Sequence, residues 1–167
     1  LLFDKSEFNT AVRQINSHFP GLMTLEIVFE GKGGKQSPRI LQESETMQTM
    51  TTMQRLLEAY PTPPEATLSF ADYLPEANRI FAGGNPKWSP IDPTDDAANG
   101  SVNALMLGSS PKAYSHVMDF TLQNGTLSLW YKNNKQETVD VALKQAKEVL
   151  AQVGVDHTDF TIRLATG

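Results

Sequence analysis

The amino-acid sequence predicts an α+β domain in which two β–α–β units share one sheet and a mostly helical insertion separates them. Three observations support this: β-forming runs alternate with amphipathic runs, Pro and Gly fall at the boundaries, and the central connection far exceeds the usual 4–6 residues. The order β-α-β-β-α-β is that of a ferredoxin-like split β–α–β layer, with both helices on one sheet face. We divide the chain into a leading helix (1–21), a first unit (22–70), an insertion called the arm (71–115) and a second unit (116–167).

The leading helix and the first unit follow from apolar periodicity and boundary residues. Residues 7–19 carry apolar side chains at helical spacing and precede a Pro-Gly pair, which predicts the leading helix. Residues 24–30, TLEIVFE, are rich in β-formers and predict a strand. Residues 37–60 predict a helix, because a Ser-Pro pair suits its first positions and a run of prolines ends it. Residues 66–70 predict the second strand of the unit.

A glycine-rich turn, GKGGKQS, follows the first strand. Such a loop between a strand and a helix can bind phosphate. Its spacing matches neither G-x-x-x-x-G-K-[ST] nor G-x-G-x-x-G, which favours a flexible turn. An acylphosphatase-like enzyme on this fold would need an arginine in that loop. The loop offers only lysines, and Arg39 lies just inside the predicted helix.

The second unit is predicted to begin with a β-hairpin. Residues 116–123 and 126–132 flank Asn124-Gly125, a strong short-range hairpin indicator. Residues 135–153 carry apolar side chains at steps of three and four, which predicts a helix that Gly154 ends. Residues 160–165 predict the last strand.

The arm has its own pattern of elements. Residues 70–82 predict a helix with Pro75 in its first turn, and the sequence GGNP ends it. A proline-punctuated loop follows at 88–96, and residues 99–107 predict a second short helix. Aromatic side chains gather along this insertion, so we expect a surface that grips an apolar molecule.

Composition excludes several classes of protein. The chain has 167 residues, 40% of them hydrophobic and 20% charged, a net charge of −5 and no cysteine. The lack of a basic cluster argues against nucleic acid as a partner, and the lack of cysteine removes disulfides and thiolate sites. No apolar run is long enough to span a membrane, and no signal peptide is visible. From the LLF start and the TIRLATG end we expect a soluble piece of a longer protein, the alternative being a processed mature protein.

The sequence predicts neither a catalytic nor a metal site. Its histidines, at positions 18, 116 and 157, fall in three separate elements without the spacing of a ligand pair. The acidic run at 92–99 could hold Ca²⁺ through Asp92, Asp95, Asp96 and Asn99, but the order does not fit an EF-hand loop. A solvated turn with helix capping is the favoured interpretation. We therefore expect no enzyme and no cofactor.

Several stretches together resemble one known family. The segments that carry the resemblance are the strand TLEIVFEG, the helix end QRLLEAYP, SFADYL at 69–74, Asn78, GNP at 84–86 and IDP at 91–93. Together they resemble the resistance–nodulation–division exporters, in their hydrophobe/amphiphile branch. The resemblance extends from about Phe8 to Gly167. Family members more often have leucine at the place of Phe70 and an acid at the place of Asn85. The closing Thr-Gly matches the point where the family's chain re-enters the membrane.

The resemblance implies a porter domain on the periplasmic side of a bacterial inner membrane. Such a domain is an extracytoplasmic loop of a proton-driven pump, here more similar to the loop of the second membrane half. The implied cargo is a lipid such as a sterol or hopanoid, and the implied partners are the other loops and the membrane helices of the pump. The proton-relay residues of the family lie in membrane helices that this sequence does not contain.

The candidate cargo-binding residues are aromatic, methionine and leucine side chains, with a few polar groups. Methionine suits surfaces that accept varied apolar partners, although a methionine stripe at helical spacing also suits a core. Asn78 and Asp72 would orient the cargo or cap the arm. The alternative function is a docking module that contacts a periplasmic carrier, an adaptor or another loop of the pump. The predicted site comprises Phe70, Tyr73, Asn78, Phe81, Trp88, Met47, Met50, Leu105 and Met106.

Overall fold

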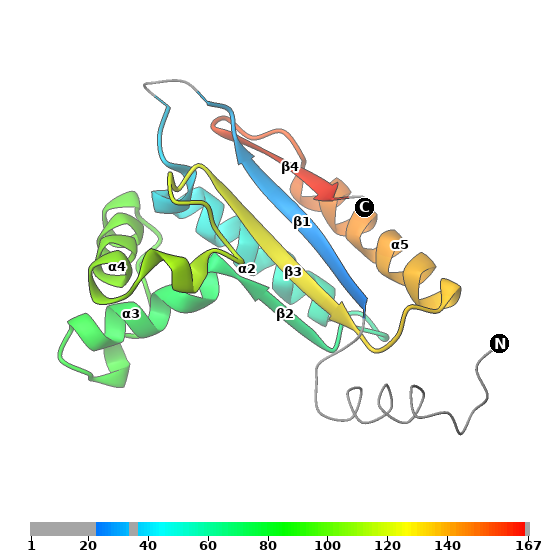
Figure 1. Ribbon diagram of the computed structural model, residues 1–167, viewed down its shortest axis with the longest axis horizontal. Coiled ribbons are helices and arrows are strands. Elements are labelled where there is room, and N and C mark those ends of the chain that lie inside the picture. Colours follow the sequence, from blue (N-terminus) through cyan, green and yellow to red (C-terminus); the bar gives the residue numbers. More distant parts are fainter. Residues whose placement is uncertain (1–22, 34–36, 166–167) are drawn as a thin grey trace.

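Four antiparallel strands form one sheet in the part of the chain that the computed structural model describes, residues 23–33 and 37–165 (Figure 1). The predicted leading helix lies outside these residues. The strands are β1 (Met23–Gly31), β2 (Ala66–Ser69), β3 (Asn124–Tyr131) and β4 (Phe160–Ala165), in the order β2-β3-β1-β4. Each β–α–β unit is thus split by a strand of the other. The predicted α+β class is confirmed.

Two helices, α2 (Ser44–Glu58) and α5 (Gln136–Val153), cover one face of this sheet (Figure 1). The covered face of β1 presents Leu25, Ile27 and Phe29, which are buried, while the residues between them stay half-buried. This alternation is the period-2 pattern of a strand with one face on a core. Met50 and Met53 of α2 are fully buried against it. The last helix and strand agree with prediction, and Gly154 ends α5 with φ +83°.

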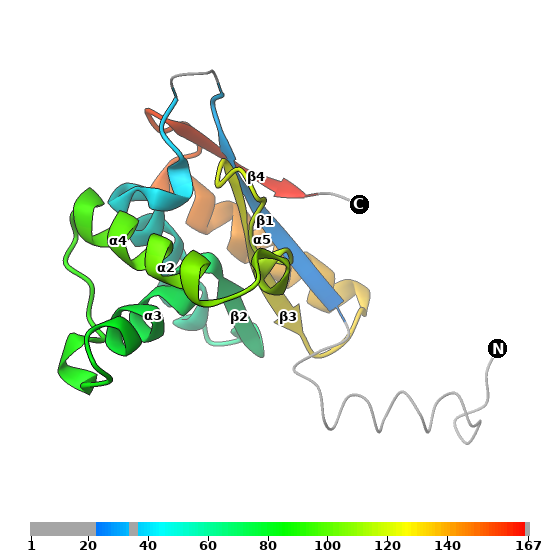
Figure 2. The same ribbon diagram turned by 60° about the vertical axis from the view of Figure 1, so that its left-hand side comes forward.

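The arm is mostly helical, as predicted, and lies beside the sheet and α2 (Figures 1 and 2). It contains α3 (Leu74–Phe81) and α4 (Asp95–Gly108), which lie side by side in both views. The 3₁₀ turns η2 (Phe70–Tyr73), η3 (Pro86–Trp88) and η4 (Pro111–Tyr114) precede, join and follow them. Pro75 lies in the first turn of α3, as predicted.

The second arm helix starts earlier than the sequence predicts. It begins at Asp95 rather than at residue 99, because the Thr94 hydroxyl accepts a hydrogen bond from the backbone N–H of Ala97 at 3.3 Å. This is an ordinary N-cap, which satisfies a donor that the first helical turn leaves unpaired. The acidic run therefore contains a helix start, in keeping with the favoured capping interpretation.

The predicted start of the long helix at Ser37-Pro38 is wrong. The helix begins at Ser44, after the 3₁₀ turn η1 (Ile40–Gln42). Ile40 and Leu41 are fully buried, and the backbone N–H of Leu41 donates to the carbonyl of Leu122 at 3.1 Å. These contacts hold the segment against the turn that precedes β3. The backbone of Glu43 is extended (φ −99°, ψ 137°), so η1 ends there and α2 starts anew at Ser44.

The predicted hairpin at Asn124-Gly125 is also wrong. These residues begin β3, and residues 116–123 form turns with one isolated antiparallel bridge, Met118 to Gly125, instead of a strand. Asp119 builds the turn: its carboxylate accepts hydrogen bonds from the backbone N–H groups of Gln123 and Asn124 and from the Thr121 hydroxyl. Burial raises the pKa of Asp119, but these bonds and one from the Asn124 side chain outweigh it and lower that pKa.

Gly125 is a glycine because its neighbours come close, not because a turn needs it. A Cβ there would lie 2.8 Å from Leu41 Cδ2, 3.0 Å from Met50 Cε and 3.3 Å from the carbonyl oxygen of Val117. A glycine inside a strand often marks such a close approach. Asn124 therefore belongs to the Asp119 turn, and Gly125 leaves room for the packing of η1 and α2. From the sequence alone, an Asn-Gly pair with these two roles looks the same as one that forms a hairpin turn.

Candidate functional site: a groove between α2 and the arm

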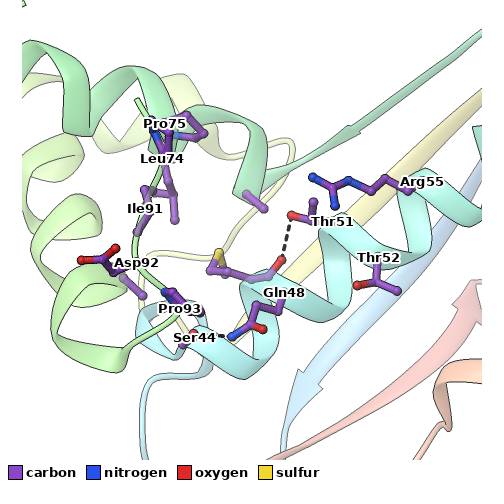
Figure 3. A pocket seen from close by; sticks show the side chains of 14 residues that line it. Ser44, Gln48, Thr51, Thr52, Arg55, Leu74, Pro75, Ile91, Asp92 and Pro93 are labelled. Atoms are coloured by element: carbon purple, nitrogen blue, oxygen red, sulfur yellow. Dashed lines mark hydrogen bonds between the residues drawn. The ribbon is translucent and has the colours of Figure 1, made fainter. Parts of the chain in front are cut away.

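A groove of about 410 Å³ opens between α2 and the arm (Figure 3). Its volume falls within the ~300–1,000 Å³ that is usual for small-molecule sites. One wall comes from α2, and the other from the start of the arm, the loop before α4, and α4 itself. The lining residues are Ser44, Met47, Gln48, Thr51, Thr52, Arg55, Ala71, Leu74, Pro75, Pro90, Ile91, Asp92, Pro93 and Ala98.

The two walls differ in chemistry. The arm wall is apolar apart from Asp92. Leu74 lies beneath it and is only 1% exposed, so its accessible apolar surface comes from Ile91, which is half-buried, and from the exposed Pro75, Pro90 and Pro93. The α2 wall is polar apart from Met47, which is 8% exposed. A molecule between the walls would meet hydrocarbon on one side and hydroxyl, amide and guanidinium groups on the other. The groove therefore suits an amphiphile.

Helical spacing produces the polar wall. Ser44, Gln48, Thr51 and Arg55 recur at steps of three and four, so they share one side of α2. Gln48 Nε2 donates to Ser44 Oγ at 2.7 Å, and Thr51 Oγ1 donates to the Met47 carbonyl at 2.9 Å, as Figure 3 shows. Met50 and Met53 point away from this side into the core.

A buried polar network fixes the first part of the arm to α2. Gln54, 6% exposed, donates from Nε2 to Asp72 Oδ2 at 2.8 Å and to Thr67 Oγ1 at 3.1 Å. Its Oε1 accepts from the buried Ser69 hydroxyl at 2.9 Å. Asp72 Oδ2 also accepts from the Ser69 backbone N–H at 2.7 Å, completing a capping box on η2. Asp72 thus caps the arm, one of its two predicted roles.

A second connection joins the start of α4 to the start of α2. Asp95 Oδ1 accepts a hydrogen bond from the Ser44 backbone N–H at 2.9 Å, so one helix caps the other. Gln42 Nε2 donates to Asn103 Oδ1 at 3.2 Å nearby. Burial raises the pKa of Glu43, and the carboxylates of Asp159 and Asp95 add to that rise. The groove is therefore fixed at both ends.

A second hollow of about 520 Å³ continues across α2. It shares Ser44, Gln48, Thr52 and Pro93 with the groove and reaches Leu56 and the end of α5. A bound molecule longer than the groove could therefore extend over α2 without leaving a concave surface.

The structure separates most of the predicted site residues from this groove. Phe70 and Met50 are fully buried in the core. Tyr73 is half-buried; its hydroxyl lies 2.9 Å from His116 Nε2, and its ring centroid lies 5.0 Å from that of Tyr114. Of the predicted residues only Met47 lines the groove.

The remaining predicted residues lie along α3 and α4. Asn78 Nδ2 donates to the carbonyl of Pro90 at 3.3 Å, which orients the loop behind the groove. Leu105 and Met106 are half-buried and pack against the core. Phe81, at the end of α3, is 58% exposed. Trp88 ends η3, and its side chain is outside what the structure describes. Cargo contact by these residues stays a prediction.

Sequence reasoning missed most of the groove. Leu74 and Ile91 belong to stretches that carry the family resemblance, SFADYL and IDP, yet no local pattern places them opposite α2. Thr51 and Arg55 were detectable as a polar stripe at helical spacing. Such a stripe usually faces solvent. It indicates a site only when the tertiary structure shows that the arm lies opposite it.

Comparison of the chain with protein-family models, curated proteins and solved structures finds no match. Within residues 23–33 and 37–165, no three histidine, aspartate or glutamate side chains gather so as to hold a metal ion. No helix in this described part is long and apolar enough to cross a membrane.

Proposed function

We propose that this chain is a porter domain of a resistance–nodulation–division exporter of the hydrophobe/amphiphile branch. It binds a hydrophobic lipid, such as a sterol or hopanoid, in the groove between α2 and the arm. The observation that carries the proposal is the contrast between the walls of the groove, apolar on the arm and polar on α2. The family resemblance adds support, because SFADYL and IDP, two of its most specific stretches, both contribute residues to the apolar wall.

The energetics of such a site are favourable without any covalent chemistry. Each CH₂ group buried from water contributes about 0.8 kcal/mol, so a lipid that buried about ten of them against Ile91 and the prolines of the arm wall would gain roughly the free energy of micromolar binding. Movement of the domain against the other loops of the pump would open and close access to the groove. In the parent pump, the membrane helices would drive that movement and the cargo would pass outward, on the periplasmic side of the inner membrane.

Filling the groove tests the proposal. Thr51→Phe places a ring on the α2 wall, where the side chain is half-buried at the helix surface. Displacement of the neutral fluorophore N-phenyl-1-naphthylamine by sterols and hopanoids reports binding. We expect about tenfold weaker binding in this variant. Lys147→Phe adds the same ring to an exposed site on α5 and should leave binding unchanged. Equal lipid affinity in both variants, or no lipid binding by the native chain, would contradict the proposal.

A docking module is a second candidate function, and an exposed apolar patch favours it. Ile80, Phe81 and Leu107 are 57%, 58% and 84% exposed, and a Cβ on Gly108 would lie 3.8 Å from the Phe81 ring. The ends of α3 and α4 therefore form a joint apolar tip, which is typical of protein contact surfaces. The partner would be another loop of the pump, a carrier or an adaptor.

The two functions respond to different substitutions. Phe81→Ser together with Leu107→Ser removes the apolar tip and leaves the groove intact. If the chain only docks, this double variant loses binding to the other loop of the pump, measured by calorimetry, and neither it nor the native chain binds lipid. If the chain binds lipid in the groove, the double variant retains native lipid affinity.

A further inference from the structure

The α2 wall of the groove ends in a cation that has no partner within the described part of the chain. Arg55 lies in the last turn of α2 and lines the groove. Among residues 23–33 and 37–165, its guanidinium makes neither an ion pair nor a hydrogen bond. Glu58, the acid three residues further along α2, accepts instead from the Thr67 hydroxyl at 2.6 Å. All five guanidinium donors of Arg55 are thus available to a ligand.

The environment of Arg55 combines this cation with neutral donors and an apolar wall. In Figure 3 its side chain reaches back along α2 toward Thr51, into the groove. The Thr52 hydroxyl lies on the same wall and has no hydrogen-bond partner in the described chain. Leu74 and Ile91 stand across the groove from these groups. A planar guanidinium beside hydroxyls matches the two oxygens of a carboxylate, or those of a phosphate or sulfate.

The opposite end of the groove carries the opposite charge. Asp92 lies on the arm wall and is far from Arg55 in the same view. An anionic group is therefore favoured at the Arg55 end and repelled at the Asp92 end, which fixes the direction of a bound molecule. The chain as a whole carries −5, so its overall field does not attract anions. Recognition of an anion in the groove depends on Arg55, the only lysine or arginine among the described residues that line it.

We propose that the groove selects amphiphiles with a single anionic head, which Arg55 binds while the apolar part lies against Ile91 and the prolines of the arm wall. This inference rests on the proposed function and narrows its cargo from neutral sterols and hopanoids to acidic lipids. An exposed cation contributes modestly to binding. A charge-assisted pair next to an apolar wall corresponds to a preference of about five- to tenfold over a neutral head on the same skeleton.

Matched ligands test the inference on the intact chain. Dodecanoate and dodecanol share one hydrocarbon chain, cholesterol sulfate and cholesterol share one ring system, and acetate supplies an anion without an apolar part. Affinities come from displacement of N-phenyl-1-naphthylamine. We expect the anionic member of each pair to bind about five- to tenfold more tightly and acetate not to compete. Raising the salt concentration from 50 to 500 mM should reduce the preference, because it shortens the Debye length to a few ångströms.

Three variants assign the preference to Arg55. Arg55→Gln should bind the neutral and anionic ligands equally, and Arg55→Lys should retain part of the preference. Lys147→Gln removes the same charge from the exposed surface of α5 and should change nothing. A cation in the last turn of a helix also stabilises the helix dipole, so Arg55 variants could lose stability. Thermal unfolding measures the stability of each variant, so a change in ligand preference without a change in stability is assigned to ligand recognition.

The possible failures are distinct. If the neutral and anionic ligands bind equally and Thr51→Phe weakens both, the inference is wrong and lipid binding in the groove stands. If Arg55→Gln keeps the preference for anionic ligands, Arg55 does not bind the anionic head. The inference is then also wrong, and lipid binding in the groove stands. If no ligand competes with the probe, the proposed function fails and this inference fails with it. Competition by acetate would show a simple anion site rather than an amphiphile site.

Discussion

The Tyr131 hydroxyl illustrates how a single buried group affects stability. Tyr131 ends β3, is 4% exposed, and its hydroxyl has no hydrogen-bond partner within the described residues. Burial raises its pKa to about 12, because the phenolate cannot be solvated there. A buried donor without an acceptor costs free energy, whereas an apolar group of the same shape does not.

We therefore expect Tyr131→Phe to leave the free energy of unfolding unchanged or to raise it by up to about 1 kcal/mol at pH 7. The folded-state pKa exceeds the unfolded value of about 10, so the folded state favours the neutral phenol. The native chain should then lose stability as the pH rises through the range from about 10 to 12. Urea unfolding at pH 7 and at pH 11 checks both points. A clear loss of stability at pH 7, or equal alkaline sensitivity in the variant, would contradict the argument.

At the scale of elements, the β3 strand shows why local patterns mislead. Asn-Gly between two β-forming runs predicts a hairpin, yet Gly125 lies inside the strand under Leu41 and Met50. The turn belongs instead to Asp119, whose carboxylate collects the preceding N–H groups. The hydrogen bonds of Asp119 span only four or five residues, but Leu41 and Met50 pack on Gly125 from far away in the sequence. That packing overrides the preference for a two-residue turn, and no local window contains it.

Two glycines with opposite environments test this account. Gly125→Ala should lower the free energy of unfolding by about 1–3 kcal/mol, because its Cβ would overlap Leu41 and Met50 in a filled core. Gly100→Ala lies within α4, where a Cβ meets nothing within 4 Å, and should raise it by about 0.5–1 kcal/mol through helix propensity. Thermal unfolding measures both. Similar effects in the two variants would mean that backbone entropy, not contact, governs position 125.

At the scale of the whole molecule, the sequence predicted the α+β class and the helical arm. These depend on periodicity, which each segment carries by itself. The groove could not be predicted in the same way, because Leu74 and Ile91 become a wall only where the arm meets α2. Some of the aromatic residues that predicted a binding surface belong to the core instead, as Phe70 does. Aromatic content alone does not distinguish buried from exposed side chains.

Gln54 connects stability to the shape of the groove, because it joins α2 to η2 through Ser69 and Asp72. Gln54→Ala leaves the buried Ser69 hydroxyl and the exposed Asp72 carboxylate with fewer partners and should lower the free energy of unfolding by about 1–3 kcal/mol. The loss should be local to the arm. By hydrogen exchange, the amides of α3 and α4 should lose protection first, while those of β1 and β3 keep most of theirs.

Gln145→Ala provides the matched control for this prediction. Gln145 is 4% exposed on α5, and its Nε2 donates to the Thr62 carbonyl at 2.9 Å, away from the arm. Because its Oε1 has no partner within the described residues, the control should cost less free energy of unfolding than Gln54→Ala, and it should cause no selective exchange in α3 and α4. If the groove needs a fixed arm, Gln54→Ala also weakens probe binding and Gln145→Ala does not. Equal binding by the two variants would mean that the walls of the groove assemble without this network.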